Sequence, residues 1–315
     1  MRRNNKLFVI LIILAIIATS AAGCMEKGDV STSSKQDHWM VVTDELNREV
    51  VIPQKPQRIV SLAPSTTEIL FAIGAGDRVV GVDDYSNYPP EATHLVKVGS
   101  YATINIEQVV DLKPDLVVAA YGNGIEVIDA LSNLGIPVVG LNPGGLDEIL
   151  DSINLLGKIT GCEENATRLT DEMRARIVAV ESMAATKDKP SVFYVIWHDP
   201  LWTAGNGTFE DEMISIAGGK NIASDLDSYS IISLEKVIDS DPDVIITTSG
   251  GGMGVAGSNL SYEYITTNPR FAGISAVKEG KVYVIDADIA TRPGPRIVDA
   301  LEEIYRCIHD DANSG

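Results

Sequence analysis

Residues 104–118 read INIEQVVDLKPDLVV, and residues 232–246 read ISLEKVIDSDPDVII. The two segments lie 128 residues apart, and Ile, Glu, Val, Asp, Pro and Asp recur at matching places. Each copy is typical of a short helix, a Pro-Asp break and a buried strand, because proline lacks an amide hydrogen and clashes with the preceding turn. The repeat therefore predicts two similarly built lobes.

Around these copies, apolar runs of strand length alternate with amphipathic segments such as residues 67–73 and 146–156. Val- and Ile-rich runs that are apolar on both faces are typical of buried parallel strands. A weaker repeat pairs residues 68–74 with 212–218, each read as a helix with a glycine C-cap. The alternation predicts an α/β fold with two Rossmann-like lobes and parallel sheets. The expected strands are Arg58–Leu62, Val79–Val82, Asp115–Ala120, Val138–Leu141, Val192–Trp197, Asp243–Thr248 and Lys281–Ile285.

One long helix is expected between the lobes, over residues 162–189. Apolar residues recur there at steps of three or four, and no glycine or proline interrupts the segment from Glu163 to Asp188. A helix of about 25 residues spans roughly 38 Å. Such a helix would act as a rigid strut that permits only small movements of the lobes.

The start of the chain has the pattern of a secretory signal, because basic residues within the first six precede an apolar run at residues 7–18. The run is shorter than the roughly 20 residues of a membrane span. The Ala-Ala-Gly-Cys junction at Cys24 resembles a lipobox, in which the cysteine is lipidated; the alternative is an uncleaved anchor. Both interpretations place the body outside the cytoplasm at a membrane. The predicted organisation is signal peptide 1–23, lipid-anchored flexible tether 24–40, N-terminal lobe 41–161, bridging helix 162–189 and C-terminal lobe 190–315.

The composition argues against several functional classes. Lys plus Arg number 25 and Asp plus Glu number 44, so the formal net charge is −19, whereas nucleic-acid binding needs a basic surface. Loss of residues 1–23 would change this charge to −22. No zinc-ligand spacing, phosphate loop, nucleophile elbow or His-Glu-x-x-His motif is present, so we expect neither a metal nor a cofactor. Cys162 and Cys307 either pair in an oxidising compartment or remain separate thiols.

Aromatic side chains recur at expected strand ends and in loops of both halves. Ligands of open α/β sheets bind beyond the carboxyl ends of the strands, where aromatic rings offer flat apolar area. Packing explains any single ring, but recurrence in both halves favours a ligand site. Arg292 and Arg296 would either meet oxygen atoms of a ligand or form structural ion pairs. The candidate aromatics are Tyr85, Tyr101, Tyr121, Trp202 and Tyr229.

Glu107 and Glu235 occupy the same position in the two copies of the repeat. The helix dipole favours a carboxylate at a helix start, which is one explanation of both residues. The other explanation is that one carboxylate on each lobe grips a matching basic group on a twofold-symmetric partner.

Other features lead to different functional classes. His198 and Asp199 are a possible acid–base pair of a surface enzyme, but no nucleophile or metal motif accompanies them, and a turn at Asp199-Pro200 is the other interpretation. The Gly-rich residues 250–257 are expected to form a mobile loop near the ligand. A third class is a cell-surface adhesion or assembly module, which would have no saturable site for a small molecule.

Three segments resemble the substrate-binding proteins of ABC importers for cobalamin and iron complexes, and the resemblance covers about residues 57–308. It implies the class III periplasmic-binding-protein fold, in which one long helix bridges two α/β lobes and the ligand lies between them. It also implies that Glu107 and Glu235 dock on arginines of a permease dimer, as the repeat suggests independently. The segments are RIVSLAPSTTEILFAIGAGDRVVGVDDYSNYPPEA, VGSYATINIEQVVDLKPDLVVA and NPRFAGISAVKEGKVYVIDADIATRPGPRIVDALEEI.

Within this family, a Ser-x-Tyr-Pro-Pro pattern after a tyrosine resembles the cobalamin-binding branch. The resemblance implies a monomeric, lipid-anchored extracytoplasmic protein, not an enzyme, that captures a corrinoid such as cobalamin (vitamin B12) and delivers it to an ABC permease. The same role for a ferric siderophore or haem is the nearest alternative. The implied ligand residues are Tyr85, Tyr101 and Tyr229 (the last two where tryptophan is usual), Trp202, Arg296 and, beside a family aromatic position at Ala120, Tyr121.

Overall fold

The computed structural model describes residues 39–249 and 259–309, and all of them belong to one unit that runs from His38 to Gly315. The predicted signal peptide, the lipidation site Cys24 and the Gly-rich segment 250–257 lie outside the described residues. Within the described ranges, none of the helices has the length and apolar character that a membrane span requires.

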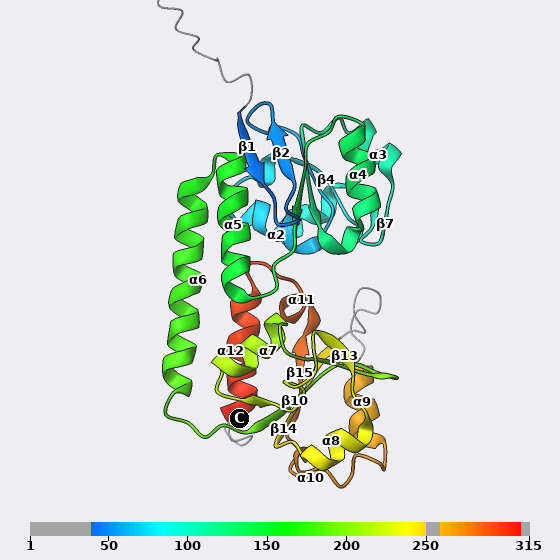
Figure 1. Cartoon of the computed structure of the whole chain (residues 1–315), viewed down its shortest axis with the longest axis vertical. Coiled ribbons are helices and arrows are strands. Elements are labelled where there is room, and N and C mark those ends of the chain that lie inside the picture. Colours follow the sequence, from blue (N-terminus) through cyan, green and yellow to red (C-terminus); the bar gives the residue numbers. More distant parts are fainter. Residues whose placement is uncertain (1–38, 250–258, 310–315) are drawn as a thin grey trace, which may run out of the picture. The chain divides into compact units, whose positions relative to one another are not determined.

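The N-terminal lobe contains a five-stranded sheet of order β5-β4-β3-β8-β9, in which every pair is parallel (Figure 1). Two small antiparallel pairs, β1–β2 and β6–β7, accompany it. The sequence predicted β3, β4, β8 and β9 to within one residue at each end. The strands are β1 Met40–Thr43, β2 Glu49–Ile52, β3 Ile59–Ser61, β4 Val79–Val82, β5 Val96–Lys97, β6 Gly99–Ser100, β7 Thr103–Ile104, β8 Leu116–Ala120 and β9 Val138–Leu141; the helices are α2 Pro64–Ala72, α3 Ile106–Asp111, α4 Ile125–Asn133 and α5 Leu146–Thr160, with 3-10 turns η1 Gly76–Arg78, η2 Pro90–His94 and η3 Tyr121–Asn123.

The C-terminal lobe contains a six-stranded sheet of order β13-β11-β10-β14-β15, with β12 also paired to β10. β10, β12, β14 and β15 are parallel, whereas β11 and β13 form an antiparallel edge. This edge departs from the predicted parallel sheet because a two-residue turn at Asp199-Pro200 reverses the chain directly. The strands are β10 Ser191–His198, β11 Leu201–Ala204, β12 Lys220–Asn221, β13 Tyr229–Ile231, β14 Val244–Ser249 and β15 Val282–Asp286; the helices are α7 Phe209–Ile216, α8 Leu234–Ser240, α9 Leu260–Thr267, α10 Ser275–Lys278, α11 Ala287–Ala290 and α12 Ile297–His309.

The two copies of the repeat fold in the same way. The side chains of Asn105 and Ser233 cap α3 and α8 by accepting a hydrogen bond from a first-turn amide. After each helix the chain turns through a residue of positive φ, Lys113 at 49° and Asp241 at 39°, directly before the repeated proline. Matching caps and turns explain why the same pattern of residues recurs in both lobes.

The aspartate of each Pro-Asp pair ties its strand to the next one. The Asp115 carboxylate accepts hydrogen bonds from the amides of Gln57 and Arg58, at 2.9 and 2.8 Å. The Asp243 carboxylate accepts them from the amide and the hydroxyl group of Ser191, both at 2.7 Å. Both carboxylates therefore fix the start of the neighbouring strand, β3 or β10.

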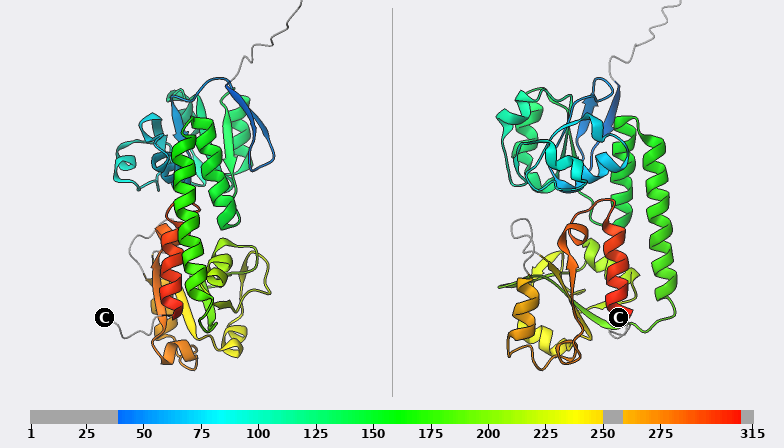
Figure 2. Two further views of the ribbon diagram at one scale, coloured as in Figure 1. Left: turned by 90° about the vertical axis from the view of Figure 1, so that its left-hand side faces the viewer. Right: turned by 180° about the vertical axis from the view of Figure 1, so that it is seen from behind.

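One helix, α6 Glu163–Ala184, runs beside both lobes (Figures 1 and 2). Its 22 residues span about 33 Å at 1.5 Å each. It packs closely on α5 because Gly157 has no side chain; a Cβ there would lie 2.3 Å from the Cβ of Ala166. The predicted class, two α/β lobes bridged by one long helix, is confirmed, while the exact domain boundaries stay predictions.

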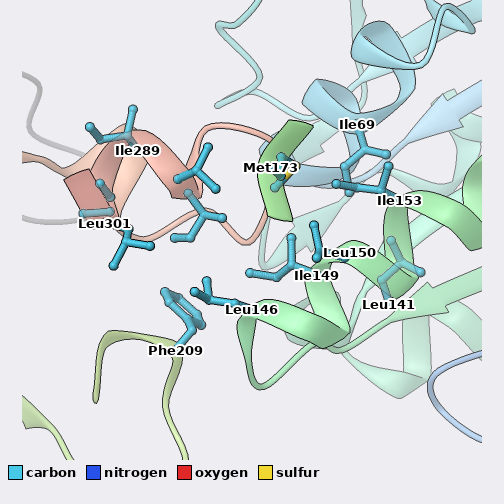
Figure 3. Packing of buried hydrophobic residues seen from close by; sticks show 14 of the residues in the cluster. Ile69, Leu141, Leu146, Ile149, Leu150, Ile153, Met173, Phe209, Ile289 and Leu301 are labelled. Carbon is cyan, nitrogen blue, oxygen red and sulfur yellow. The ribbon is translucent and has the colours of Figure 1, made fainter. Parts of the chain in front are cut away.

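A single cluster of buried apolar side chains continues from one lobe into the other (Figure 3). It runs from Ile69 of α2 and Ile153 of α5, past Met173 of α6, to Phe209 of α7 and Leu301 of α12. Burial of apolar surface stabilises by about 25 cal/mol per Å². A shared core therefore favours a fixed arrangement of the lobes.

No disulfide joins Cys162 to Cys307 in the structure. The thiol of Cys162 instead lies 3.1 Å from the Nη2 atom of Arg78, which donates to it. Of the two possibilities that the sequence left open, the structure therefore has separate thiols.

Candidate functional site

The loop after β4 carries two tyrosines and is held in place by buried polar groups. The carboxylate of Asp83, fully buried, accepts hydrogen bonds from the Ser86 hydroxyl group and from the Tyr85 amide, the latter at 3.0 Å. The Ser86 hydroxyl group also lies 2.8 Å from that of Thr67 on α2. Burial raises the pKa of Asp83. The network fixes a loop that leaves Tyr85 half-buried and Tyr88 44% exposed.

Asn123 connects the segments that carry the other two tyrosines of this lobe. Its Nδ2 atom donates to the carbonyl of Tyr101 at 2.8 Å, and its Oδ1 atom accepts from the amide of Ala120 at 2.7 Å. The Tyr101 ring lies against Gly122, where a Cβ would be 2.1 Å from the phenolic oxygen. Tyr121 directly follows β8 and is 64% exposed. The structure therefore positions all three predicted tyrosines on ordered loops at strand ends.

The C-terminal lobe presents its predicted aromatics on the antiparallel edge of its sheet. Trp202 of β11 lies opposite Ile231 of β13, and Tyr229 lies opposite Ala204. Residues directly opposite, and residues two apart along a strand, share one face of a sheet. Trp202 and Tyr229 therefore lie on the same face, together with Ile231, which is 56% exposed.

Two residues of this face, Ile231 and Trp197, were not among the predicted aromatic and ligand residues. Ile231 is two residues beyond Tyr229, so the strand period of two would have found it if the short segment Tyr229-Ser-Ile had been read as a strand. Trp197 of β10 pairs with Trp202, next to the His198–Leu201 pair that closes the turn. The two-residue turn at Asp199-Pro200 would have indicated this pairing if Leu201–Ala204 had been predicted as a strand.

Beneath Tyr229 lies a buried carboxyl group. The Tyr229 hydroxyl group donates to the Oε2 atom of Glu210 at 3.0 Å, and Glu210 is 2% exposed. Burial raises the pKa of Glu210 to about 8, and no cation of the described residues counteracts this effect. The hydroxyl group of Tyr194, also buried, has no hydrogen-bond partner among the described residues, and Glu210 contributes to raising the pKa of Tyr194 after burial. At neutral pH Glu210 is therefore largely a neutral acid that holds the Tyr229 ring.

Replacement of Glu210 by glutamine should remove a pH-dependent part of the stability. An unfolded glutamate loses its proton near pH 4.3, at about its ordinary pKa, whereas the folded one keeps it to about pH 8. The free energy of unfolding of the wild type therefore falls through this window, by up to about 1.4 kcal/mol per pH unit from this group alone. We expect Glu210→Gln to gain about 3.5 kcal/mol relative to wild type between pH 5 and pH 8, measured by urea unfolding. A difference between the two proteins that stays constant with pH would contradict the buried acid.

Arg296, predicted as a ligand residue, forms an ion pair between the lobes. Its Nε and Nη2 atoms donate to the two oxygens of Glu68 on α2, at 2.8 and 2.7 Å. Arg292 adds a third bond to Glu68 at 3.1 Å and pairs with Asp288 at 2.5 Å. Arg296 also lies 4.2 Å from the centre of the Tyr88 ring. The Glu68 carboxylate, 2% exposed, is thus enclosed by two arginines of the other lobe.

A second glutamate makes a hydrogen bond between the lobes, in this case from the C-terminal lobe to the N-terminal one. The Oε2 atom of Glu212 on α7 accepts a hydrogen bond from the amide of Leu146, the first residue of α5, at 2.7 Å. The N-cap residue of that helix, Gly145, offers no side-chain oxygen, so Glu212 takes over this role. Glu68 and Glu212 are matching positions in the weaker repeat, so each lobe offers one equivalent glutamate to the other.

The glutamates of the stronger repeat lie on the surface. Glu107 is in the first turn of α3 and Glu235 in the first turn of α8, and both are exposed. Neither makes a hydrogen bond or an ion pair with the described residues. Their carboxylates are therefore available to a partner, as the proposed docking role requires.

His198 and Asp199 lie at the turn between β10 and β11. The Nδ1 atom of His198 is 3.3 Å from the Ser261 hydroxyl group, and its ring packs between Trp197 and Tyr264. The backbone carbonyl of Asp199 accepts a hydrogen bond from the Trp197 indole at 2.8 Å. The pair thus forms a tight hairpin, which agrees with the turn interpretation.

Two of the surface cavities in the described parts of the chain are not lined by any predicted ligand residue. One, of about 330 Å³, is bordered by residues 188–190, 243–244, 281 and 307–309. The other, of about 440 Å³, is bordered by residues 48–53 and 129–138. The case for a ligand site therefore depends on the aromatic loops and on β11 and β13.

Comparison with known proteins places this fold. Residues 59–289 match the family model described as periplasmic binding protein. An uncharacterised ABC transporter substrate-binding lipoprotein of Bacillus subtilis is 32% identical over 320 residues, 99% of this chain and 99% of that protein. The structure of the periplasmic vitamin B12-binding protein of Vibrio cholerae is 32% identical, with a TM-score of 0.70 over 81% of this chain and 97% of that one. A periplasmic heme-binding protein from Roseiflexus is 29% identical, with a TM-score of 0.71 over 81% and 98%.

The fold and these similarities define an extracytoplasmic substrate-binding protein of an ABC transporter. The chain belongs to the periplasmic binding protein family, with a resemblance to its cobalamin-binding and iron-complex-binding members. Members of this family are not enzymes, so His198 and Asp199 have no catalytic role to fill. Membership implies two partners, a ligand and a permease.

Proposed function

We propose that the chain captures a corrinoid between its two lobes and delivers it to an ABC permease. The observation that carries this proposal is the pair of aromatic surfaces, one on the loops of the N-terminal lobe and one on β11 and β13. Flat rings on two sides suit a broad planar ligand, because stacking buries much apolar area. The similarity to the vitamin B12-binding protein of Vibrio cholerae supports the same choice. In this proposal the ligand contacts are Tyr85, Tyr101, Tyr121, Trp202, Tyr229 and Arg296.

Arg296 retains hydrogen-bonding capacity for a ligand despite its ion pair. A guanidinium group has five N–H donors, and the bonds of Arg296 to Glu68 and to the Asp288 carbonyl use only Nε and Nη2. Nη1 has no hydrogen-bond partner among the described residues. We propose that Nη1 donates to an amide or carboxylate oxygen of the ligand.

A ferric siderophore or haem is the second candidate. The similarity to the Roseiflexus heme-binding protein favours it. Several rings of the proposed site are tyrosines, and a phenolic oxygen is a known ligand of ferric iron. The exposed Tyr121 has its hydroxyl group without a partner among the described residues, whereas that of Tyr229 is bound to Glu210.

Calorimetric titration separates these ligands. We expect saturable binding of cyanocobalamin and much weaker binding of haem and of ferric siderophores. Trp202→Ala should weaken the cobalamin complex about tenfold or more, because truncation of a buried aromatic anchor removes the stacking area. Trp39→Ala, which truncates an exposed tryptophan beside β1, is the matched control and should bind as wild type does. Tight binding of a siderophore or haem without binding of cobalamin would overturn the corrinoid proposal.

We further propose that the protein is anchored as a monomer through a lipidated Cys24. Cys24→Ala should then release the mature chain from membranes into the soluble fraction, because a lipid-modified N-terminus can no longer form. Fractionation followed by immunoblotting measures this. Persistent membrane attachment of the variant would instead indicate an uncleaved N-terminal anchor.

A further inference from the structure

Beside each proposed docking glutamate lies an exposed apolar side chain. Val110 follows Glu107 by three residues on α3, and Ile238 follows Glu235 by three residues on α8. Residues three apart on a helix are neighbours on its surface. Val110 is 38% exposed and Ile238 is 45% exposed, and neither belongs to a hydrophobic cluster of the described residues.

The two apolar residues are related by the same repeat as the glutamates. Among the large apolar side chains that are exposed in the described parts of the chain, only Val110 and Ile238 lie 128 residues apart. Asp111 and Asp239, also repeated and exposed, follow directly and add negative charge. Each lobe therefore shows the same surface, a carboxylate and an apolar side chain side by side on a short helix.

The small free energy of an exposed ion pair explains why a docking surface would combine the glutamates with the apolar residues. An exposed ion pair contributes only about 0–1 kcal/mol and is screened by salt. Two such pairs alone would hold a partner weakly. An apolar contact next to each pair would bury area and exclude water, which strengthens the charge–charge attraction.

We infer that Val110 and Ile238 form, with Glu107 and Glu235, the docking surface for the permease of the importer. The inference extends the proposed docking role of the glutamates and rests on it. Its partner chemistry is a pair of twofold-related sites, each with a cationic group beside an apolar one. The repeated carboxylates of this chain would be complemented by cationic groups on the partner, and the pseudo-twofold repeat matches a symmetric dimer.

The test compares two double variants for binding to the purified permease complex in nanodiscs, at low and high salt. Val110→Ser with Ile238→Ser should weaken docking about tenfold, from roughly 50 Å² of lost apolar contact, at both salt concentrations. Glu107→Gln with Glu235→Gln should weaken docking chiefly at low salt, because salt already screens the charges of the wild type. Val178→Ser with Leu134→Ser is the matched control, because these exposed residues are not related by the repeat. It should dock as the wild type does.

The outcomes distinguish the inference from the docking role on which it rests. If the serine variant docks like the wild type while the glutamine variant does not, the apolar contact is refuted and the role of the glutamates stands. If neither variant changes docking, both are refuted. Unfolding midpoints and cyanocobalamin affinities of all variants should match the wild type, and a loss of stability confined to the serine variant would instead assign Val110 and Ile238 to packing.

Discussion

Replacement of both Glu107 and Glu235 by alanine should abolish uptake of the ligand and leave its binding unchanged. The two carboxylates are exposed, lie in the first turns of α3 and α8, and have no partner among the described residues. Their removal therefore has little effect on the fold; exposed substitutions of this kind usually change stability by less than about 0.5 kcal/mol. Uptake of labelled cobalamin by cells that carry only the variant measures the first effect, and titration of the purified protein measures the second.

The control for this variant replaces two other glutamates at helix starts. Glu126 and Glu263 lie in the first turns of α4 and α9, are exposed, and are not related by the repeat. Glu126→Ala with Glu263→Ala should transport like the wild type. Reduced ligand affinity of the Glu107 and Glu235 variant, or normal uptake by it, would contradict the docking role.

Replacement of Glu68 by glutamine should destabilise the protein by about 3–5 kcal/mol. The Glu68 side chain is 2% exposed and accepts bonds from Arg292 and Arg296. A neutral amide there leaves the enclosed guanidinium group of Arg296 without its carboxylate partner and that of Arg292 with Asp288 alone. The expected loss of stability is large because both arginine side chains are mostly buried: Arg292 is 12% exposed and Arg296 is 19% exposed. Urea unfolding at neutral pH measures the change.

An exposed ion pair between helices provides the comparison. Arg176 of α6 bonds Asp299 and Glu302 of α12 at 2.6 and 2.8 Å, but its side chain is 40% exposed. Arg176→Gln should reduce stability by less than about 1 kcal/mol. Similar losses for Glu68→Gln and Arg176→Gln would show that the buried pair between the lobes is no stronger than a surface pair.

The architecture was predictable because its signals are local. Each copy of the repeat contains its own cap, its own helix stop and a continuous apolar strand, and a parallel strand buried on both faces reads as such a run. The antiparallel edge was not predicted because β11 and β13 are only four and three residues long, and Thr203 and Ser230 interrupt any apolar run.

The contacts between the lobes were not predictable, because they join residues that are far apart in the sequence and no local pattern connects the two partners. Arg296 meets Glu68 across 228 positions, and either residue alone fits a surface role. The acidic start of α7 makes the same point, because nothing in the sequence distinguishes the neighbouring carboxylates of Glu210, Asp211 and Glu212. In the structure Glu210 is buried against Tyr229, Asp211 bonds Asn221, and Glu212 caps a helix of the other lobe. Only the three-dimensional fold assigns them these three different roles.

The absorption spectrum of the protein, purified from its source together with its native ligand, tests the corrinoid proposal most directly. The account predicts the bands of a corrinoid, removed on unfolding and restored when cobalamin is added during refolding. The bands of haem or of a ferric siderophore in their place would contradict it.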